Sequence, residues 1–163
     1  MAGNLFSNLQ VLMRDTDIDN ALHTVENAMR TILPRHNRTL KPDSQGARGQ
    51  YIVSVREGYY YWINVHHHDL TGDVQGEAPE ILAQIAAELS AEVGKSVVHM
   101  QLITLNSLNL SLYENGMLID SIHNTLQDDA DKTVVNANPE KWTPLLASGV
   151  TPDYLRGILA QDT

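Results

Sequence analysis

Leucines occupy every second position of residues 108–113, with polar or amphipathic residues between them. A period of two places alternate residues on opposite faces of a β-strand, so this stretch is predicted to have one dry and one wet face. The apolar stretch at 97–104 is predicted as the strand before it, and residues 117–123 as the strand after it. These three strands are the best-defined part of the predicted fold.

A tight hairpin is predicted at the Asn-Gly pair of residues 115–116, because both residue types tolerate the positive φ that such turns need. A two-residue loop would pair Leu112 with Ile119. A three-residue loop at 114–116 keeps more apolar residues on the leucine face and is the favoured register. It predicts three cross-strand pairs: Leu112–Leu118, Leu110–Asp120 and Leu108–Ile122. Asp120 then lies on the apolar side, either at a solvated sheet edge or inward beside a polar partner.

A second hairpin is predicted between residues 50 and 65. β-Branched and aromatic residues fill 51–55 and 59–65, and residues 56–58 join the two strands. Alternation divides the second strand into a face directed at the core and an opposite face. The core face is expected to hold Tyr59, Tyr61, Ile63 and Val65, and the opposite face Tyr60, Trp62, Asn64 and His66.

Two long amphipathic helices are predicted from apolar residues spaced three and four positions apart. The first follows a cap at Asp15 or Thr16 and stops at Pro34. The second spans residues 77–93 and ends at Gly94, a natural C-cap. The two apolar stripes are Ile18, Leu22, Val25, Met29 and Ile32, and Ile81, Leu82, Ile85, Ala86, Leu89 and Val93.

Two short helices are predicted near the end of the chain, because a formula of cap, proline and acidic residue occurs twice. The first copy is Asn138-Pro139-Glu140 and the second is Thr151-Pro152-Asp153. Each is followed by apolar residues at helical spacing. The pair is expected to pack on the sheet, or to hold a helix of a partner.

Residues 9–13 complete the pattern as a first strand, with a short helical turn as the alternative. The resulting order of elements matches the ferredoxin-like βαββαβ pattern, extended by a hairpin and two short helices. We therefore predict a single α+β domain over residues 1–163, with a mostly antiparallel sheet and both long helices on one face. The opposite face is left for the C-terminal helices, a ligand or a second subunit, so a homo-oligomer through this open face is one expectation.

Two sequence features resemble a group of bacterial proteins for which no activity is established. One is the strand that ends Leu-Tyr-Glu-Asn-Gly at residues 112–116, followed by Leu-Ile-Asp at 118–120. The other is Asn-Pro-Glu-Lys-Trp at 138–142, followed by two leucines. The resemblance covers roughly residues 80–160 and implies a shared hairpin and C-terminal helical portion, but no catalytic residues.

Composition excludes several classes of protein. Eleven basic against twenty acidic residues give a net charge of −9, which argues against binding to nucleic acid or to anionic membranes. The chain has no cysteine, so disulfides, thiolate nucleophiles and cysteine-ligated metals are excluded. The sequence holds no apolar run of membrane-spanning length and no signal peptide pattern, so a cytoplasmic location is expected.

Two polar segments interrupt the predicted elements. Residues 35–49 are rich in arginine, proline and glycine and are predicted to form a long basic loop. Arg35, Arg38 and Arg48 make it the one place where a phosphate or carboxylate ligand would be drawn, although it lacks the glycine spacing of a phosphate-binding loop. Residues 124–137 are acidic and are predicted to be a solvated linker to the C-terminal helices.

A run of three histidines and an aspartate at residues 66–69 is a candidate metal site, because imidazole and carboxylate bind divalent metals. His66 and His68 would point the same way on an extended chain, and Asp69 follows them. A catalytic metal usually needs a third protein ligand. His99, His123 or Asp120 would supply it only if the sheet brought them close. The alternative is a solvated strand end.

None of the common catalytic motifs occurs in the chain. The leading hypothesis is therefore a non-enzymatic binding or regulatory protein, of the inhibitor or immunity type, that acts without a cofactor on a protein partner. Its binding surface would contain Tyr60 and Trp62, because such side chains supply large contact area at low entropic cost. The alternative is a hydrolase-like metal-dependent enzyme centred on His66, His68 and Asp69.

Overall fold

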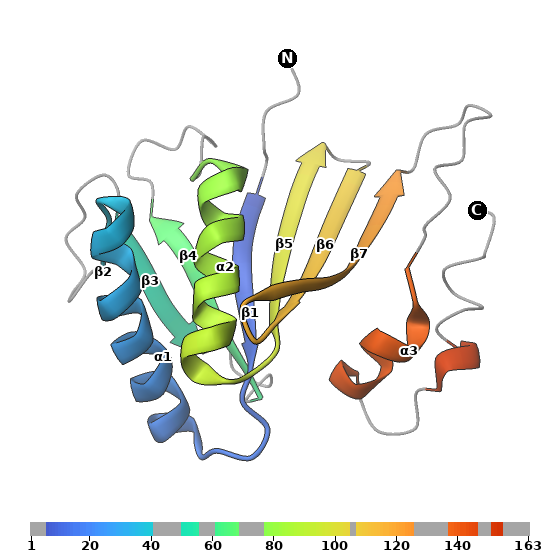
Figure 1. The fold of residues 1–163 in the computed structure, drawn as a ribbon, viewed down its shortest axis with the longest axis horizontal. Helices are drawn as coiled ribbons and strands as arrows, with labels where there is room; N and C mark the ends of the chain where they lie inside the picture. The colour runs from blue at the N-terminus through green and yellow to red at the C-terminus, as the bar shows by residue number, and fades with distance from the viewer. Residues whose placement is uncertain are drawn as a thin grey trace.

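The computed structural model describes residues 6–40, 50–55, 61–68, 77–104, 107–125, 137–146 and 151–154. These residues form one seven-stranded sheet in the order β2-β3-β4-β1-β5-β6-β7. Figure 1 shows two long helices, α1 and α2, lying together on one side of this sheet, while the short helix α3 lies beyond β7. The predicted α+β class, with a mostly antiparallel sheet, is confirmed.

The ferredoxin-like unit is present at the centre of the sheet. Its strands, in the order β3-β4-β1-β5, are all antiparallel to their neighbours. β1 is a strand, as expected, rather than a helical turn, and it begins earlier than predicted. The strand bounds are β1 Phe6–Leu12, β3 Gln50–Val55, β4 Trp62–His68 and β5 Val97–Thr104. The two-residue strand β2 Thr39–Leu40 adds a parallel edge beside β3.

Helices α1 Ile18–Ile32 and α2 Pro79–Val93 begin slightly later than predicted. Asp17, rather than either predicted residue, caps α1, because its side chain accepts a hydrogen bond from Asn20 N. Pro34 does not end the helix abruptly, since a 3-10 turn, η1 Leu33–His36, continues it. Gly94 ends α2 at φ 62°, in the left-handed conformation expected of a glycine C-cap.

The hairpin of β6 Ser107–Glu114 and β7 Met117–Thr125 corrects the predicted register. The turn has two residues, Asn115 and Gly116, so Glu114 pairs with Met117. A bulge then shifts the register, and Leu112 lies opposite Asp120 rather than Leu118. Leu110 pairs with Ile122 and Leu108 with Asn124. The extra residue keeps Asp120 and Ile122 on the leucine face, as predicted. Leu118 instead pairs with Tyr113 on the other face, so its predicted face and the predicted pairs are wrong.

The hairpin of β3 and β4 also has a longer connection than predicted. Val55 pairs with Ile63, so β4 begins at Trp62 and the predicted loop of residues 56–58 is too short. Ile63 and Val65 are buried under the helices, as expected. Tyr61, predicted to face the core, is 58% exposed in the turn before the strand. Residues 56–60, which include the predicted Tyr59 and Tyr60, lie outside the described residues.

Apolar residues form two clusters, one on each face of the sheet. The larger cluster fills the space between the sheet and α1 and α2, and Tyr51, Leu9, Met29 and Leu82 are completely buried in it. The smaller cluster lies on the opposite face, where Trp142 and Leu145 pack on Val98, Leu112 and Ile122. These two residues belong to α3 Pro139–Trp142 and the 3-10 turn η2 Thr143–Leu145. The first C-terminal helix therefore packs on the sheet.

The predicted loop of residues 35–49 is wrong over its first part. Arg35 and His36 belong to η1, and Thr39 and Leu40 form β2. Residues 41–49 lie outside the described residues, as do most of the predicted acidic linker and the greater part of the second C-terminal helix. No helix in the described ranges is both long and apolar enough to cross a lipid bilayer.

Candidate functional site

The sheet face opposite α1 and α2 carries a groove with a volume of about 830 Å³. Its floor is formed by side chains from five adjacent strands, β3, β4, β1, β5 and β6, and one wall is formed by α3 and η2. Among the described residues that line it, most are apolar and none is charged. The lining residues are Asn8, Gln10, Ser54, Val55, Trp62, Asn64, Val98, Met100, Leu110, Trp142, Leu145 and Leu146.

The wall is held to the sheet by hydrogen bonds with β7. Asp120 Oδ2 accepts from the indole nitrogen of Trp142 at 2.8 Å and from the backbone nitrogen of Asn138 at 2.7 Å. Lys141 Nζ donates to the backbone oxygen of Ile119 at 3.0 Å. Asp120 combines the two roles considered for it, because it lies half-buried on the edge strand of the sheet and its carboxylate has polar partners.

A second connection to the wall comes from Arg14, two residues after β1. Its guanidinium donates to the backbone oxygens of Pro144, Leu145 and Leu146 at 2.8, 3.2 and 2.6 Å. Carbonyls at the end of a short helix have no partners within the helix, and a planar cation with several donors satisfies them well. Arg14 therefore fixes the end of η2 beside the groove.

Trp62 and Trp142 are the two largest aromatic side chains of the groove. Trp62 is the first residue of β4, is half-buried, and packs against the apolar cluster beneath the wall. Its direction is the one predicted, away from the two long helices. Trp142 is 4% exposed and is part of that cluster. Tyr60, predicted to share the surface with Trp62, lies outside the described residues.

Three carboxamides form a polar cluster on the groove floor. The side-chain nitrogens of Asn8 and Gln10 each donate to Asn64 Oδ1 at 2.8 Å. Asn64 Nδ2 lies 2.9 Å from His66 Nδ1 and 3.5 Å from Ser54 Oγ. Asn8 is 5% exposed, and its buried Oδ1 has no hydrogen-bond partner among the described residues. The floor thus contains one buried acceptor that the described residues leave unsatisfied.

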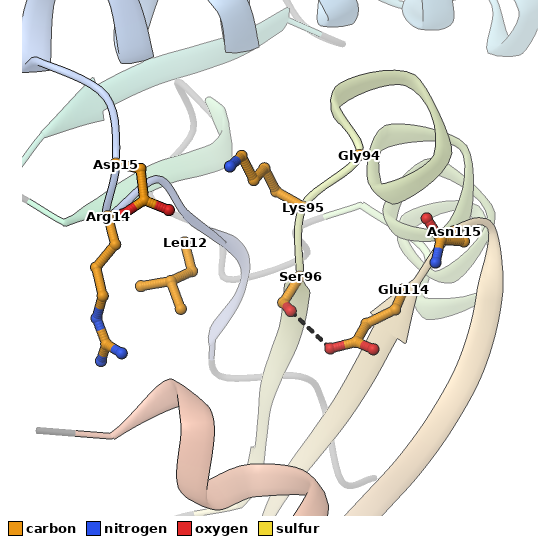
Figure 2. A pocket seen from close by; sticks show the side chains of 8 residues that line it. All are labelled: Leu12, Arg14, Asp15, Gly94, Lys95, Ser96, Glu114 and Asn115. Atoms are coloured by element: carbon orange, nitrogen blue, oxygen red, sulfur yellow. Dashed lines mark hydrogen bonds between the residues drawn. The ribbon is translucent and has the colours of Figure 1, made fainter. Parts of the chain in front are cut away.

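A smaller cavity of about 390 Å³ lies at the end of the sheet where α2 meets β5. Figure 2 shows that side chains of both charges surround it. Ser96 Oγ donates to Glu114 Oε1 at 2.7 Å, and the Arg14 guanidinium points away from the cavity toward η2. The lining is mixed in charge, so it does not select an anion or a cation. Arg14 belongs to its lining, while the guanidinium of this residue bonds to the end of η2.

The arginines of the predicted anion site are placed apart from one another. Arg35 Nη1 lies 2.9 Å from Glu88 Oε2 on α2. Arg38 forms two hydrogen bonds with the buried carboxylate of Glu77, at 2.6 and 3.0 Å. Arg48 lies outside the described residues. Both described arginines are therefore neutralised by glutamates of the chain, and binding of an anion between them stays a prediction.

Glu77 is the centre of a buried network that joins β3, the segment before β2 and the start of α2. Besides Arg38, the hydroxyl of Tyr51 donates to Glu77 Oε2 at 2.9 Å and Ala78 N donates to Oε1 at 3.2 Å. Burial alone would raise the pKa of Glu77, but the hydrogen bonds from Arg38 and Tyr51 lower it overall. Burial raises the pKa of Tyr51 far above its usual range, so the phenol stays protonated.

The histidine run divides between the two faces of the sheet. His66 is half-buried beside Asn64, on the side of the groove. His67 packs edge-on against Tyr51, with ring centroids 5.3 Å apart. His68 ends β4, and Asp69 lies outside the described residues. No group of three metal-ligating side chains is found among the described residues, and the metal site stays a prediction.

His99, one of the proposed third ligands, is buried on the helix side of β5. Its Nε2 lies 2.9 Å from Ser7 Oγ. Burial lowers its pKa to about 4, because desolvation disfavours the charged imidazolium. At neutral pH the ring is therefore uncharged and satisfied by a neutral hydroxyl. His123, on β7, lies next to Asn109 on the same face of the sheet as His99. Asp120 lies on the opposite face.

Several groove residues could not be singled out from the sequence. Asn8 and Gln10 alternate with Leu9 and Val11, a pattern that predicts their face but not their contact with Asn64. Arg14 gives no signal, because its partners are backbone oxygens about 130 positions away. Comparison with known proteins adds no further assignment, because no family model, no curated protein and no solved structure matches this chain.

Proposed function

We propose that this chain is a non-enzymatic binding protein whose groove receives an apolar segment of a basic protein partner. The observation that carries the proposal is the groove itself, on the sheet face opposite α1 and α2, whose described lining is mainly apolar and without charge. A concave surface lined mainly by apolar side chains, with a few polar groups among them, is typical of a binding site. Trp62 and Trp142 supply the residue type most enriched among residues that dominate binding energy.

The dimensions of the groove favour a peptide segment. Its floor crosses four strand intervals, about 19 Å at the usual spacing of strands. A single helix with its side chains is about 10–12 Å across and fits within that width. The groove would then take the apolar side of an amphipathic segment, as other helix-in-groove complexes do.

The charge of the chain favours a basic partner. Twenty acidic residues stand against eleven basic ones, for a net charge of −9. The uncharged groove would contact the apolar side of the segment, while the surrounding negative potential attracts its basic side and accelerates encounter. An inhibitor of the immunity type, bound to a basic target, is consistent with this arrangement.

The proposal can be tested with a random peptide library displayed on phage and selected against the folded protein. Selected peptides are expected to combine apolar and basic residues, and to bind Trp62→Ala at least tenfold more weakly, as for the loss of a central contact. Tyr61→Ala is the matched control, because Tyr61 is an exposed aromatic outside the groove lining.

Circular dichroism of both variants would establish that they remain folded. Peptides that lack basic residues, or that bind Trp62→Ala as tightly as the wild type, would contradict the proposal. Self-association of the protein through the groove would be detected by sedimentation. If the protein forms a dimer that dissociates in Trp62→Ala, the occupant of the groove would be a second copy of the chain instead of a peptide partner.

A further inference from the structure

The groove contains a feature that an apolar occupant alone would not need. Asn8 lines its floor and is 5% exposed, and its Oδ1 is buried without a hydrogen-bond partner among the described residues. Leaving a buried acceptor unsatisfied costs roughly 1–3 kcal/mol, so such atoms are rare and call for an explanation. A donor carried by the occupant would remove that cost.

In the observed arrangement, the hydrogen bonds of the carboxamide cluster leave Oδ1 as the unsatisfied atom of Asn8. Asn64 Oδ1 already accepts from both Asn8 Nδ2 and Gln10 Nε2. Turning the Asn8 carboxamide around would place two carbonyl oxygens against each other. In this arrangement the free group of Asn8 is an acceptor, and it selects a donor.

The residues that line the groove favour a donor group that is neutral and is carried by an apolar side chain. None of the described lining residues is charged, so a buried ammonium or guanidinium would lose its hydration without gaining a counter-charge from them. A hydroxyl donor would bring acceptor lone pairs that also need partners. An indole N–H is a donor only, on a large apolar ring.

We propose that the partner segment anchors in this groove through a tryptophan side chain, whose N–H donates to Asn8 Oδ1. This inference rests on the proposed function and specifies the chemistry of the occupant. Met100 lies opposite Asn8 on β5 and also lines the groove. Its flexible thioether side chain can move aside to give the ring access to the buried oxygen.

The test compares indole with N-methylindole, which has the same ring but no N–H donor. Titrations of the full chain, followed by ligand-observed NMR, should show that indole binds about tenfold more tightly, as for one buried hydrogen bond. In Asn8→Leu, which has a side chain of similar length without an acceptor, the two probes should bind within twofold of each other. Equal affinities of the two probes for the wild type would overturn the inference.

A second readout requires no variant and guards against a misfolded Asn8→Leu. The carbon resonance of the Asn8 carboxamide should shift when indole is added and stay in place with N-methylindole. Failure to bind either probe, or an unmoved resonance, also overturns the tryptophan anchor. The binding-protein proposal is decided separately by the selected peptides and Trp62→Ala. If the two probes bind the wild type equally and neither binds Trp62→Ala, the groove would remain a binding site. Only the proposed hydrogen bond from a tryptophan N–H would be refuted.

Discussion

Asp120 Oδ2 accepts a hydrogen bond from Trp142 Nε1 at 2.8 Å, and this contact joins the last strand of the sheet to the wall of the groove. The same oxygen accepts from Asn138 N, so one carboxylate oxygen serves both the start and the end of α3. Because the bulge in β7 puts Asp120 on the leucine face, the placement of the wall depends on the register of the last hairpin.

Asp120→Ala should detach the wall from β7, because the backbone of Asn138 and the indole of Trp142 both lose their acceptor. We expect a loss of about 1–3 kcal/mol in the free energy of unfolding, measured in urea. Asp120→Asn is the matched control, since it retains one acceptor oxygen and should lose less. Equal losses in the two variants would show that charge, rather than the acceptor, holds the wall.

Arg14→Ala should loosen the end of η2 without unfolding the sheet. The guanidinium satisfies three backbone oxygens there, so its removal should speed hydrogen exchange at the Leu146 amide roughly tenfold. Arg14→Lys should give an intermediate rate, because an ammonium has fewer donors and no planar geometry. Arg30→Ala, on the exposed side of α1, serves as the control. Unchanged exchange at Leu146 in Arg14→Ala would refute the role given to Arg14 in holding the end of η2.

Glu77→Gln should reduce stability at neutral pH by about 2 kcal/mol, because hydrogen bonds from Arg38 and Tyr51 lose a charged acceptor. The folded-state pKa of Glu77 is lowered, so its contribution is complete above the unfolded pKa of about 4.3. It is lost as the pH falls through the folded pKa. The difference in unfolding free energy between wild type and variant should therefore shrink below about pH 4.

Glu80→Gln is the matched control for this series, because Glu80 is exposed in the first turn of the same helix. It should change stability by less than about 0.5 kcal/mol. A constant difference between wild type and Glu77→Gln across the acid range would contradict the role given to the carboxylate.

His99 should make the fold sensitive to mild acid. Burial lowers its folded pKa to about 4, whereas the unfolded pKa is about 6.5. Between these two pH values the unfolded chain binds a proton at His99 and the native state does not. The free energy of unfolding therefore falls by about 3 kcal/mol as the pH drops from about 6.5 to about 4. His99→Gln should remove this part of the pH dependence. NMR titration of the His99 ring would measure the folded pKa directly, and a value near 6.5 would refute the prediction.

The fold could be predicted because its elements are encoded by local periodicity. The alternating leucines of β6 and the stripes of α1 and α2 each specify a buried face over a few residues. The register of the β6–β7 hairpin was harder to predict. Asn115 and Gly116 favour a two-residue turn, while the leucine face requires a different alignment, and the bulge at residue 119 satisfies both.

The candidate site was only partly visible in the sequence. Trp62 stands out because alternation in β4 directs it away from the core. The unsatisfied oxygen of Asn8 depends on an orientation that three residues from β1 and β4 determine together. The contact of Arg14 with η2 depends on backbone oxygens far along the chain. Every residue has a backbone oxygen, so the sequence gives no sign of this contact.

The attachment of α3 and η2 sets an order of assembly during synthesis. The ferredoxin-like unit is complete once β5 has left the ribosome, whereas the wall is encoded after residue 136. The emerging chain can therefore bury its main core before the groove exists. The proposed recognition of a partner through this groove would then begin only after residues 137–146 have been translated.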